Sequence, residues 1–416
     1  MKKILYLIGF LCLFQSCEKE SFPYETYQAN ADEIDSIYFS PGSNSLIADG
    51  KATLQFVLEA FRKVAVSGPN GSKKDTMMFV DYHTLPAEQV QIFVDGKAQQ
   101  EMEFKTKDLG NQEISLYAQV GKVKSKVKTI KLRKPPVAVA KRVVDVVFHV
   151  FELEPTDPSY DPLTYQVIEQ RHLEQAVAYA NLVFANANGK DPNGANAAIE
   201  FRLAKKNVAG ANLALPGYNK IMYNSSWRAS SFFSLADFTK KINATNAYQW
   251  NKEKFLNIYL LPLTASNSLG IQRANYQIVP AGSTPIPGVA NIVNSIADVP
   301  TTDFYTTFGL GIHRNIFFPG MDRNIEIASY LGVYYGLYRT TVVDDYVSDT
   351  RKYTFSNNIT NSLLKIGNDG EKFLANNALD DIRYPSLRNS FTLGQVERMR
   401  LLMERSPVRS NWTTEN

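Results

Sequence analysis

The sequence predicts an α+β protein in which an N-terminal β-sandwich is followed by a mixed α/β domain. Two patterns in the 416 residues support this prediction. Side chains alternate with period two from about residue 35 to 133, and beyond that point apolar strands are separated by stretches of helical spacing. Between the two patterns, Arg133-Lys134-Pro135-Pro136 marks a linker, because consecutive prolines favour extended backbone. We therefore place one domain at 35–133 and another at 137–416.

The first domain is predicted from short alternating runs. Residues 54–58 and 90–94 alternate apolar and polar side chains, and the second run meets Asp95-Gly96, a pair typical of tight hairpins. Several such strands within about a hundred residues indicate an immunoglobulin-like β-sandwich. A module of this kind serves as a spacer or a binding platform, and its fold alone does not decide which.

The second domain begins with a near-continuous apolar run, which is typical of a strand buried on both faces. A helix with apolar side chains at helical spacing and a further strand follow, as in a crossover unit. Near the end, Thr392 and Gln395 form a capping box for a helix that runs to about Arg405. The predicted strands are Val143–Phe151, Ile199–Leu203, Phe255–Leu263 and Phe308–Phe318, and the predicted helix covers residues 173–184.

The N-terminus has the pattern of an export signal. Lys2 and Lys3 precede an apolar run too short to span a bilayer, and the run is followed by Cys17. This predicts a lipoprotein signal at 1–17, a lipid on Cys17 that binds the membrane, and a polar tether at 18–34. The acid-rich start after Cys17 favours an outer-membrane protein displayed at the surface. The net charge of +4 gives no indication of nucleic-acid binding.

Residues 328–340 read Ala-Ser-Tyr-Leu-Gly-Val-Tyr-Tyr-Gly-Leu-Tyr-Arg-Thr. This stretch resembles the active-site helix of the bacterial zinc-dependent metalloproteinase lipoproteins, relatives of the pappalysins, which carry Ala-His-Glu-Ile-Gly-His-Tyr-Leu-Gly-Leu-Tyr-His-Thr. The glycines and several packing residues agree. The three histidine ligands of the pattern correspond to Ser329, Val333 and Arg339, and its general-base glutamate corresponds to Tyr330. The resemblance implies a zincin-like fold in which the chemical groups are replaced.

The replacements remove the chemistry of a zinc site. Two histidines one helical turn apart bind one metal, and the glutamate between them activates the bound water. Val333 has no lone pair, Arg339 is a permanent cation, and Tyr330 titrates near pH ~10 when unperturbed. Further along, Asn377-Ala378-Leu379-Asp380 resembles the methionine turn of the family, with Leu379 in place of methionine. No zinc, other cofactor or catalytic residue is therefore expected.

Scaffold segments extend the resemblance over most of residues 143–409, in the family's order. They include Val146–Val150, Phe255–Leu263 and the closing stretch Phe391–Arg400. A family-like acidic stretch contains Asp344, Asp345 and Asp349, which are weak candidates for a calcium site because calcium takes oxygen ligands from loops. Ordinary turn hydrogen bonds are the favoured alternative for these side chains.

Three functions follow as hypotheses. The first is a lipid-anchored pseudopeptidase that binds a peptide or protein as an added strand without cutting it. The second is a hydrolase that uses Tyr330, Arg339, Asp344, Asp345 and Asp380. The third is a lipoprotein that binds its partner through the β-sandwich. We also expect Arg339 to fill the place of the metal and, if it is buried, to pair with a nearby carboxylate such as Asp344 or Asp345, because an unpaired buried charge is costly.

Overall fold

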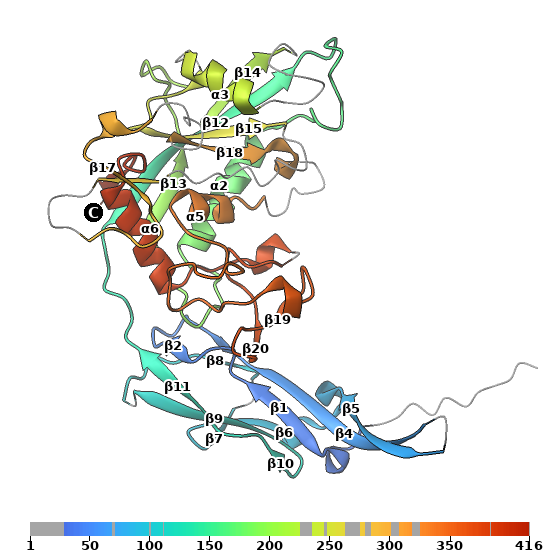
Figure 1. The fold of residues 1–416 in the computed structure, drawn as a ribbon. Coiled ribbons are helices and arrows are strands. Elements are labelled where there is room, and N and C mark those ends of the chain that lie inside the picture. Colours follow the sequence, from blue (N-terminus) through green and yellow to red (C-terminus); the bar gives the residue numbers. More distant parts are fainter. Residues whose placement is uncertain are drawn as a thin grey trace, which may run out of the picture. The chain divides into compact units, whose positions relative to one another are not determined.

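The structure is a computed structural model that describes residues 29–68, 71–99, 101–110, 112–224, 235–244, 248–262, 275–278, 284–300, 308–317, 325–382 and 384–415. The predicted signal, Cys17 and most of the tether lie outside these residues and stay predictions. None of the helices in the described ranges is long and apolar enough to cross a membrane. Figure 1 shows the fold.

The chain forms two compact units. The first comprises the residues up to Ile37 together with Glu59–Val90 and Val120–Val123, and the second comprises Tyr38–Leu58, Gln91–Gln119 and the residues from Lys124 onward. The domain boundaries inferred from the sequence remain predictions. The main element of the first unit is an antiparallel hairpin in which Ala60–Ser67 pairs with Lys73–Val80.

The residues before the proline linker form strands, as predicted, together with short 3₁₀ helices. In the second unit they build a sheet of order β2-β11-β9-β6-β7, with β10 beside β9. Asp95 and Gly96 both have positive φ, 46° and 75°, and join β6 to β7 in the expected tight turn. The strands are β1 Ser36–Ser40, β2 Ser45–Ile47, β3 Leu54–Gln55, β4 Val57–Ser67, β5 Lys73–Val80, β6 Val90–Val94, β7 Lys97–Gln99, β8 Glu103–Phe104, β9 Glu113–Val120, β10 Val123–Lys124 and β11 Lys128–Arg133.

Beyond the linker, helices and strands alternate, which confirms the α+β class. The elements are β12 Lys141–Leu153, α2 Gln170–Phe184, β13 Ile199–Leu203, β14 Tyr218–Tyr223, α3 Leu235–Ala244, β15 Phe255–Leu261, β16 Tyr276–Ile278, β17 Asn291–Val293, β18 Gly309–His313, α5 Ala328–Tyr334, β19 Leu364–Ile366, β20 Lys372–Leu374, α6 Leu393–Arg405 and β21 Thr413–Glu415. The central sheet has the order β13-β12-β15-β18, and these four strands are parallel. The predicted crossover from β12 through α2 to β13 is confirmed.

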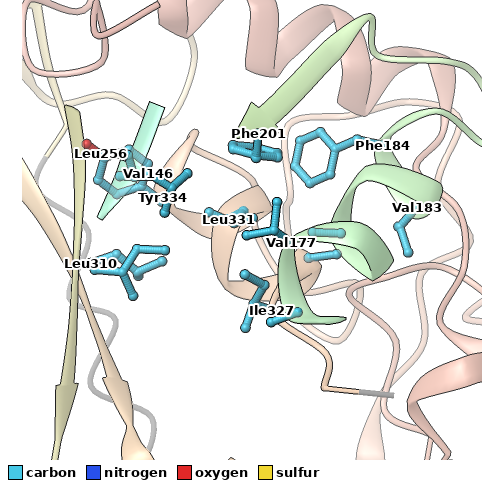
Figure 2. Close-up of a cluster of buried hydrophobic side chains, with 14 of the residues drawn as sticks. Val146, Val177, Val183, Phe184, Phe201, Leu256, Leu310, Ile327, Leu331 and Tyr334 are labelled. Carbon is cyan, nitrogen blue, oxygen red and sulfur yellow. The ribbon is translucent and has the colours of Figure 1, made fainter. Parts of the chain in front are cut away.

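Alternate side chains of the sheet enter different cores. Val146, Leu256 and Leu310 pack on one face with α2, α5 and α6, and Figure 2 shows part of this cluster. On the other face, Phe151 and Tyr259 pack with α3. Because both faces are covered, the strands are apolar along their whole length rather than alternating. Burial on both faces also explains the near-continuous apolar run of Val143–Phe151 in the sequence.

One strand differs in detail from its prediction. The strand expected at Phe308–Phe318 ends at His313, where the chain enters a 3₁₀ turn and Arg314 becomes buried. The Arg314 guanidinium donates to the Phe151 carbonyl and pairs with Glu152 at 3.1 Å, so polar contacts to β12 hold the buried side chain at the start of this turn. The closing helix α6 begins as predicted, with the reciprocal capping box of Thr392 and Gln395 in place.

Candidate functional site

Helix α5 carries Ser329, Tyr330 and Val333, three of the positions that the sequence pattern singled out. Its inward face, including Leu331 and Tyr334, packs into the core shown in Figure 2. The helix ends in a Schellman motif. The Gly336 N–H donates to the Val333 carbonyl at 2.9 Å, and the Leu337 N–H donates to the Gly332 carbonyl at 3.0 Å. The chain therefore turns sharply after α5, as it does in the pattern.

Both glycines of this stretch are required by packing. Gly336 has a φ of 91°, and a Cβ added to it would overlap Cδ1 of Leu402. A Cβ on Gly332 would lie 3.0 Å from the ring of Phe391. The conformation and close contacts of these glycines explain their presence without reference to a metal.

Ser329, at the first ligand position, is engaged by a neighbouring carboxylate. Its N–H donates to Oε1 of Glu326 at 2.7 Å and its Oγ donates to Oε2 at 2.8 Å. Glu326 is only 2% exposed and pairs with Arg388 at 3.2 Å. Neither Glu326 nor Arg388 lies in the thirteen-residue pattern, so that pattern contained no indication of their role here.

Val333 and Leu379 belong to the same apolar core. Both are buried, at 9% and 1% exposure, and both pack within the cluster that contains α2, α5 and α6. Leu379 lies in a turn held by its neighbours, since its N–H donates to Oδ1 of Asn377 at 3.0 Å. These two positions contribute apolar packing and no metal-ligating atom.

Tyr330 and Arg339 lie in a charged setting. Burial raises the pKa of the Tyr330 phenol, and Glu326 raises it further, whereas Arg339 and Arg388 act in the opposite direction. Arg339 itself is half-buried. A phenol with a raised pKa stays protonated at neutral pH, so Tyr330 acts as a hydrogen-bond donor or acceptor rather than as a base.

The expected pairing of Arg339 with Asp344 or Asp345 is wrong. Both carboxylates pair with Lys352 instead, at 3.3 and 3.1 Å. Asp345 also accepts from the Thr350 hydroxyl at 2.5 Å. Lys352 and Thr350 lie within a few residues of the two carboxylates in the sequence. Asp344 and Asp345 therefore have local partners in place of Arg339.

Asp349, the third calcium candidate, faces a different set of groups. Its Oδ2 accepts from Arg133 at 2.9 Å and from the Gly394 N–H at 3.0 Å. Asp344 and Asp345 thus share Lys352 and each accept from the backbone N–H two residues on, as in the alternative of ordinary turn contacts. The partners of Asp349 are distant in the sequence. Across the described ranges, no group of three or more histidine, cysteine or acidic side chains has the geometry to hold a metal ion.

The structure instead brings together three aspartates that are far apart in the sequence. Asp191, Asp349 and Asp380 line a small cavity of about 30 Å³, a volume sufficient for a water molecule. Burial, together with the charges of Asp349 and Asp380, raises the pKa of Asp191 to about 7. Burial also raises the pKa of Asp380 to about 6, although Thr340 donates to it at 2.6 Å. No spacing along the chain could have indicated this cluster.

The five residues suggested for an alternative hydrolase do not all meet. Asp344 and Asp345 face Lys352, and Asp380 faces Thr340, whereas Tyr330 is influenced by Glu326, Arg339 and Arg388. His149 of β12 is a packed core histidine. It is fully buried, contacts Asn257 at 2.8 Å, and has a pKa lowered by burial to about 4.

Comparison with known proteins gives matches among solved structures. No protein-family model matches the sequence, and no curated protein matches it. Mature mirolysin of Tannerella forsythia in complex with a cleaved peptide is 20% identical with a TM-score of 0.45, covering 66% of this chain and 96% of that one. A promirolysin mutant of the same organism is 19% identical with a TM-score of 0.44, covering 66% and 85%, and mirolysin in complex with compound 9 is 20% identical with a TM-score of 0.43, covering 66% and 96%. Mirolysin is a bacterial zinc metallopeptidase. A likeness of this degree assigns no activity to the chain described here.

Proposed function

We propose that the second domain is a metallopeptidase-like domain that binds a peptide or protein segment without zinc and without cleaving it. One observation carries the proposal: two of the side chains at the positions that correspond to zinc ligands are engaged in other contacts. The Ser329 hydroxyl donates to Glu326, and Val333 lies in the apolar core. Arg339, at the third position, is a cation that repels a divalent metal.

The sheet beside α5 offers a way to bind an extended segment. In the described part of the chain, the sheet order ends at β18, which pairs with β15 on its inner side. Leu310 of β18 packs in the same cluster as α5 (Figure 2). An extended ligand that pairs with the outer edge of β18 would gain main-chain hydrogen bonds and lie next to a strand that packs with α5, the helix of Tyr330.

Metal analysis of the purified protein, combined with a cleavage assay, tests this proposal. We expect no bound zinc after dialysis against a zinc buffer, and no hydrolysis of casein with or without added zinc. Stoichiometric zinc, together with casein cleavage that a chelator blocks, would refute the proposal.

A restored variant provides the matched comparison. It carries Ser329→His, Tyr330→Glu, Val333→His and Arg339→His, which rebuild the ligand set of the family pattern. We expect this variant to take up zinc and the original chain not to do so. Equal zinc content in both proteins would mean that the metal binds elsewhere, and the link between these positions and a lost site would be wrong.

We further propose that the protein is a lipoprotein of the outer membrane, with lipid on Cys17 and display at the cell surface. The support is the charged and then apolar N-terminus that ends in Cys17. Labelling of cells with radioactive palmitate should mark the original protein and leave Cys17→Ser unmarked. Label on the Cys17→Ser variant would contradict lipidation at this residue, and resistance of the intact-cell protein to added protease would contradict surface display.

A further inference from the structure

The former metal site has an excess of positive charge. Three charged groups influence the Tyr330 phenol: the carboxylate of Glu326 and the guanidinium groups of Arg339 and Arg388. One negative charge thus faces two positive ones. In the family pattern, a divalent cation held by neutral histidines would supply the positive charge of this place, whereas here arginine side chains supply it.

Glu326 is already engaged by other donors than Arg339. Its Oε1 accepts from the Ser329 N–H at 2.7 Å, and its Oε2 accepts from the Ser329 hydroxyl at 2.8 Å and from Arg388 at 3.2 Å. Since Arg388 already neutralises this buried carboxylate, the charge of Arg339 remains uncompensated by it.

Other nearby carboxylates are engaged as well. Asp344 and Asp345 pair with Lys352, and Asp380 accepts from Thr340 and from the Asn377 N–H. Within the described ranges, no ion pair involves Arg339, although its side chain is half-buried. A partly desolvated guanidinium gains most from a carboxylate that meets its fork of N–H donors.

We propose that Arg339 binds a carboxylate of the peptide ligand, so that the domain selects acidic peptides. This inference rests on the proposed peptide-binding function and specifies its ligand. Tyr330 lies beside the bound carboxylate as a neutral hydroxyl donor, and Arg388 adds positive potential while it holds Glu326. The carboxylate is either an aspartate or glutamate side chain or the C-terminus of the ligand, since both present the same group to Arg339.

Selection from a random heptapeptide display library tests the ligand class. The purified protein, Arg339→Gln and Arg405→Gln are each immobilised and used for selection at low salt. Arg405 is the matched control because it is a half-buried arginine, like Arg339, whose NH1 donates to the Thr284 carbonyl, outside this cluster. Arg339→Gln removes a charge without an ion pair in the described structure, so its melting temperature should be unchanged or higher.

We expect the original protein and Arg405→Gln to enrich peptides with aspartate or glutamate at one position, and Arg339→Gln to lose this enrichment. Selected peptides are then synthesised with a free or amidated C-terminus and with glutamate replaced by glutamine. Loss of the relevant carboxylate should weaken binding to the original protein by about tenfold or more, and binding to Arg339→Gln much less. The two replacements distinguish a side-chain carboxylate from a C-terminal one.

The contrary outcomes separate this inference from the function on which it rests. Enrichment of peptides without acidic residues or a carboxylate requirement, or the same selection by Arg339→Gln, would overturn the inference and leave peptide binding intact. Failure of every heptapeptide to bind the original protein would instead overturn the proposed function, and the inference with it.

Discussion

Replacement of Gly336 by alanine tests whether the turn after α5 is required by packing. The backbone φ of 91° is unfavourable for a side chain, at a cost of about 1–2 kcal/mol. The new methyl group would also overlap Leu402, which is completely buried and packs with Ile286 and Val289, and overpacking of this kind costs about 1–3 kcal/mol. We therefore expect Gly336→Ala to lower the free energy of unfolding by about 2–5 kcal/mol, measured by urea denaturation.

Gly370 is the matched control for the conformational part of this cost. Its φ of 82° is similar, but a Cβ added there meets no atom within 4 Å. Gly370→Ala should therefore lose only the conformational cost of about 1–2 kcal/mol. The difference between the two variants measures the close approach to Leu402. Equal losses in both variants would refute the packing argument, and the glycine would then be explained by turn conformation alone.

Three further predictions concern buried polar groups, each measured by urea denaturation. Ser329→Ala removes a hydroxyl donor from buried Glu326 and should cost about 1–3 kcal/mol; no loss would mean that the contact is unimportant. Because the pKa of His149 is lowered to about 4, the unfolded chain binds more protons below pH ~6.5. The protein should therefore lose roughly 3 kcal/mol as pH falls to about 4, and His149→Gln should lack this component of the pH dependence. Because the pKa of Asp191 is raised to about 7, the folded chain retains a proton that the unfolded chain releases above pH ~4. Stability should decrease as pH rises from about 4 to about 7, less so in Asp191→Asn, and identical pH profiles would contradict the assignment.

The sequence alone determined the local elements of the fold. The apolar run of Val143–Phe151 predicted a buried strand, Asp95-Gly96 predicted a hairpin, and the pair Thr392 and Gln395 predicted the start of α6. Such features depend on residues within a few positions of one another, and their backbone preferences therefore appear directly in the sequence pattern. The strand at Phe308–Phe318 was predicted too long because its end depends on Arg314 and a carbonyl from β12.

The sequence predicted only some of the residues of the candidate site. The pattern of residues 328–340 singled out Ser329, Val333 and Arg339, and in the structure the Ser329 hydroxyl donates to Glu326 and Val333 packs in the apolar core. Only the tertiary structure brought Glu326 and Arg388 together beside Tyr330, and only it gathered Asp191, Asp349 and Asp380 around one cavity. Ion pairs and carboxylate clusters are decided by which distant segments meet and which partner is nearest. Burial then magnifies each charge interaction, so the electrostatic state of the site belongs to the folded chain rather than to any stretch of its sequence.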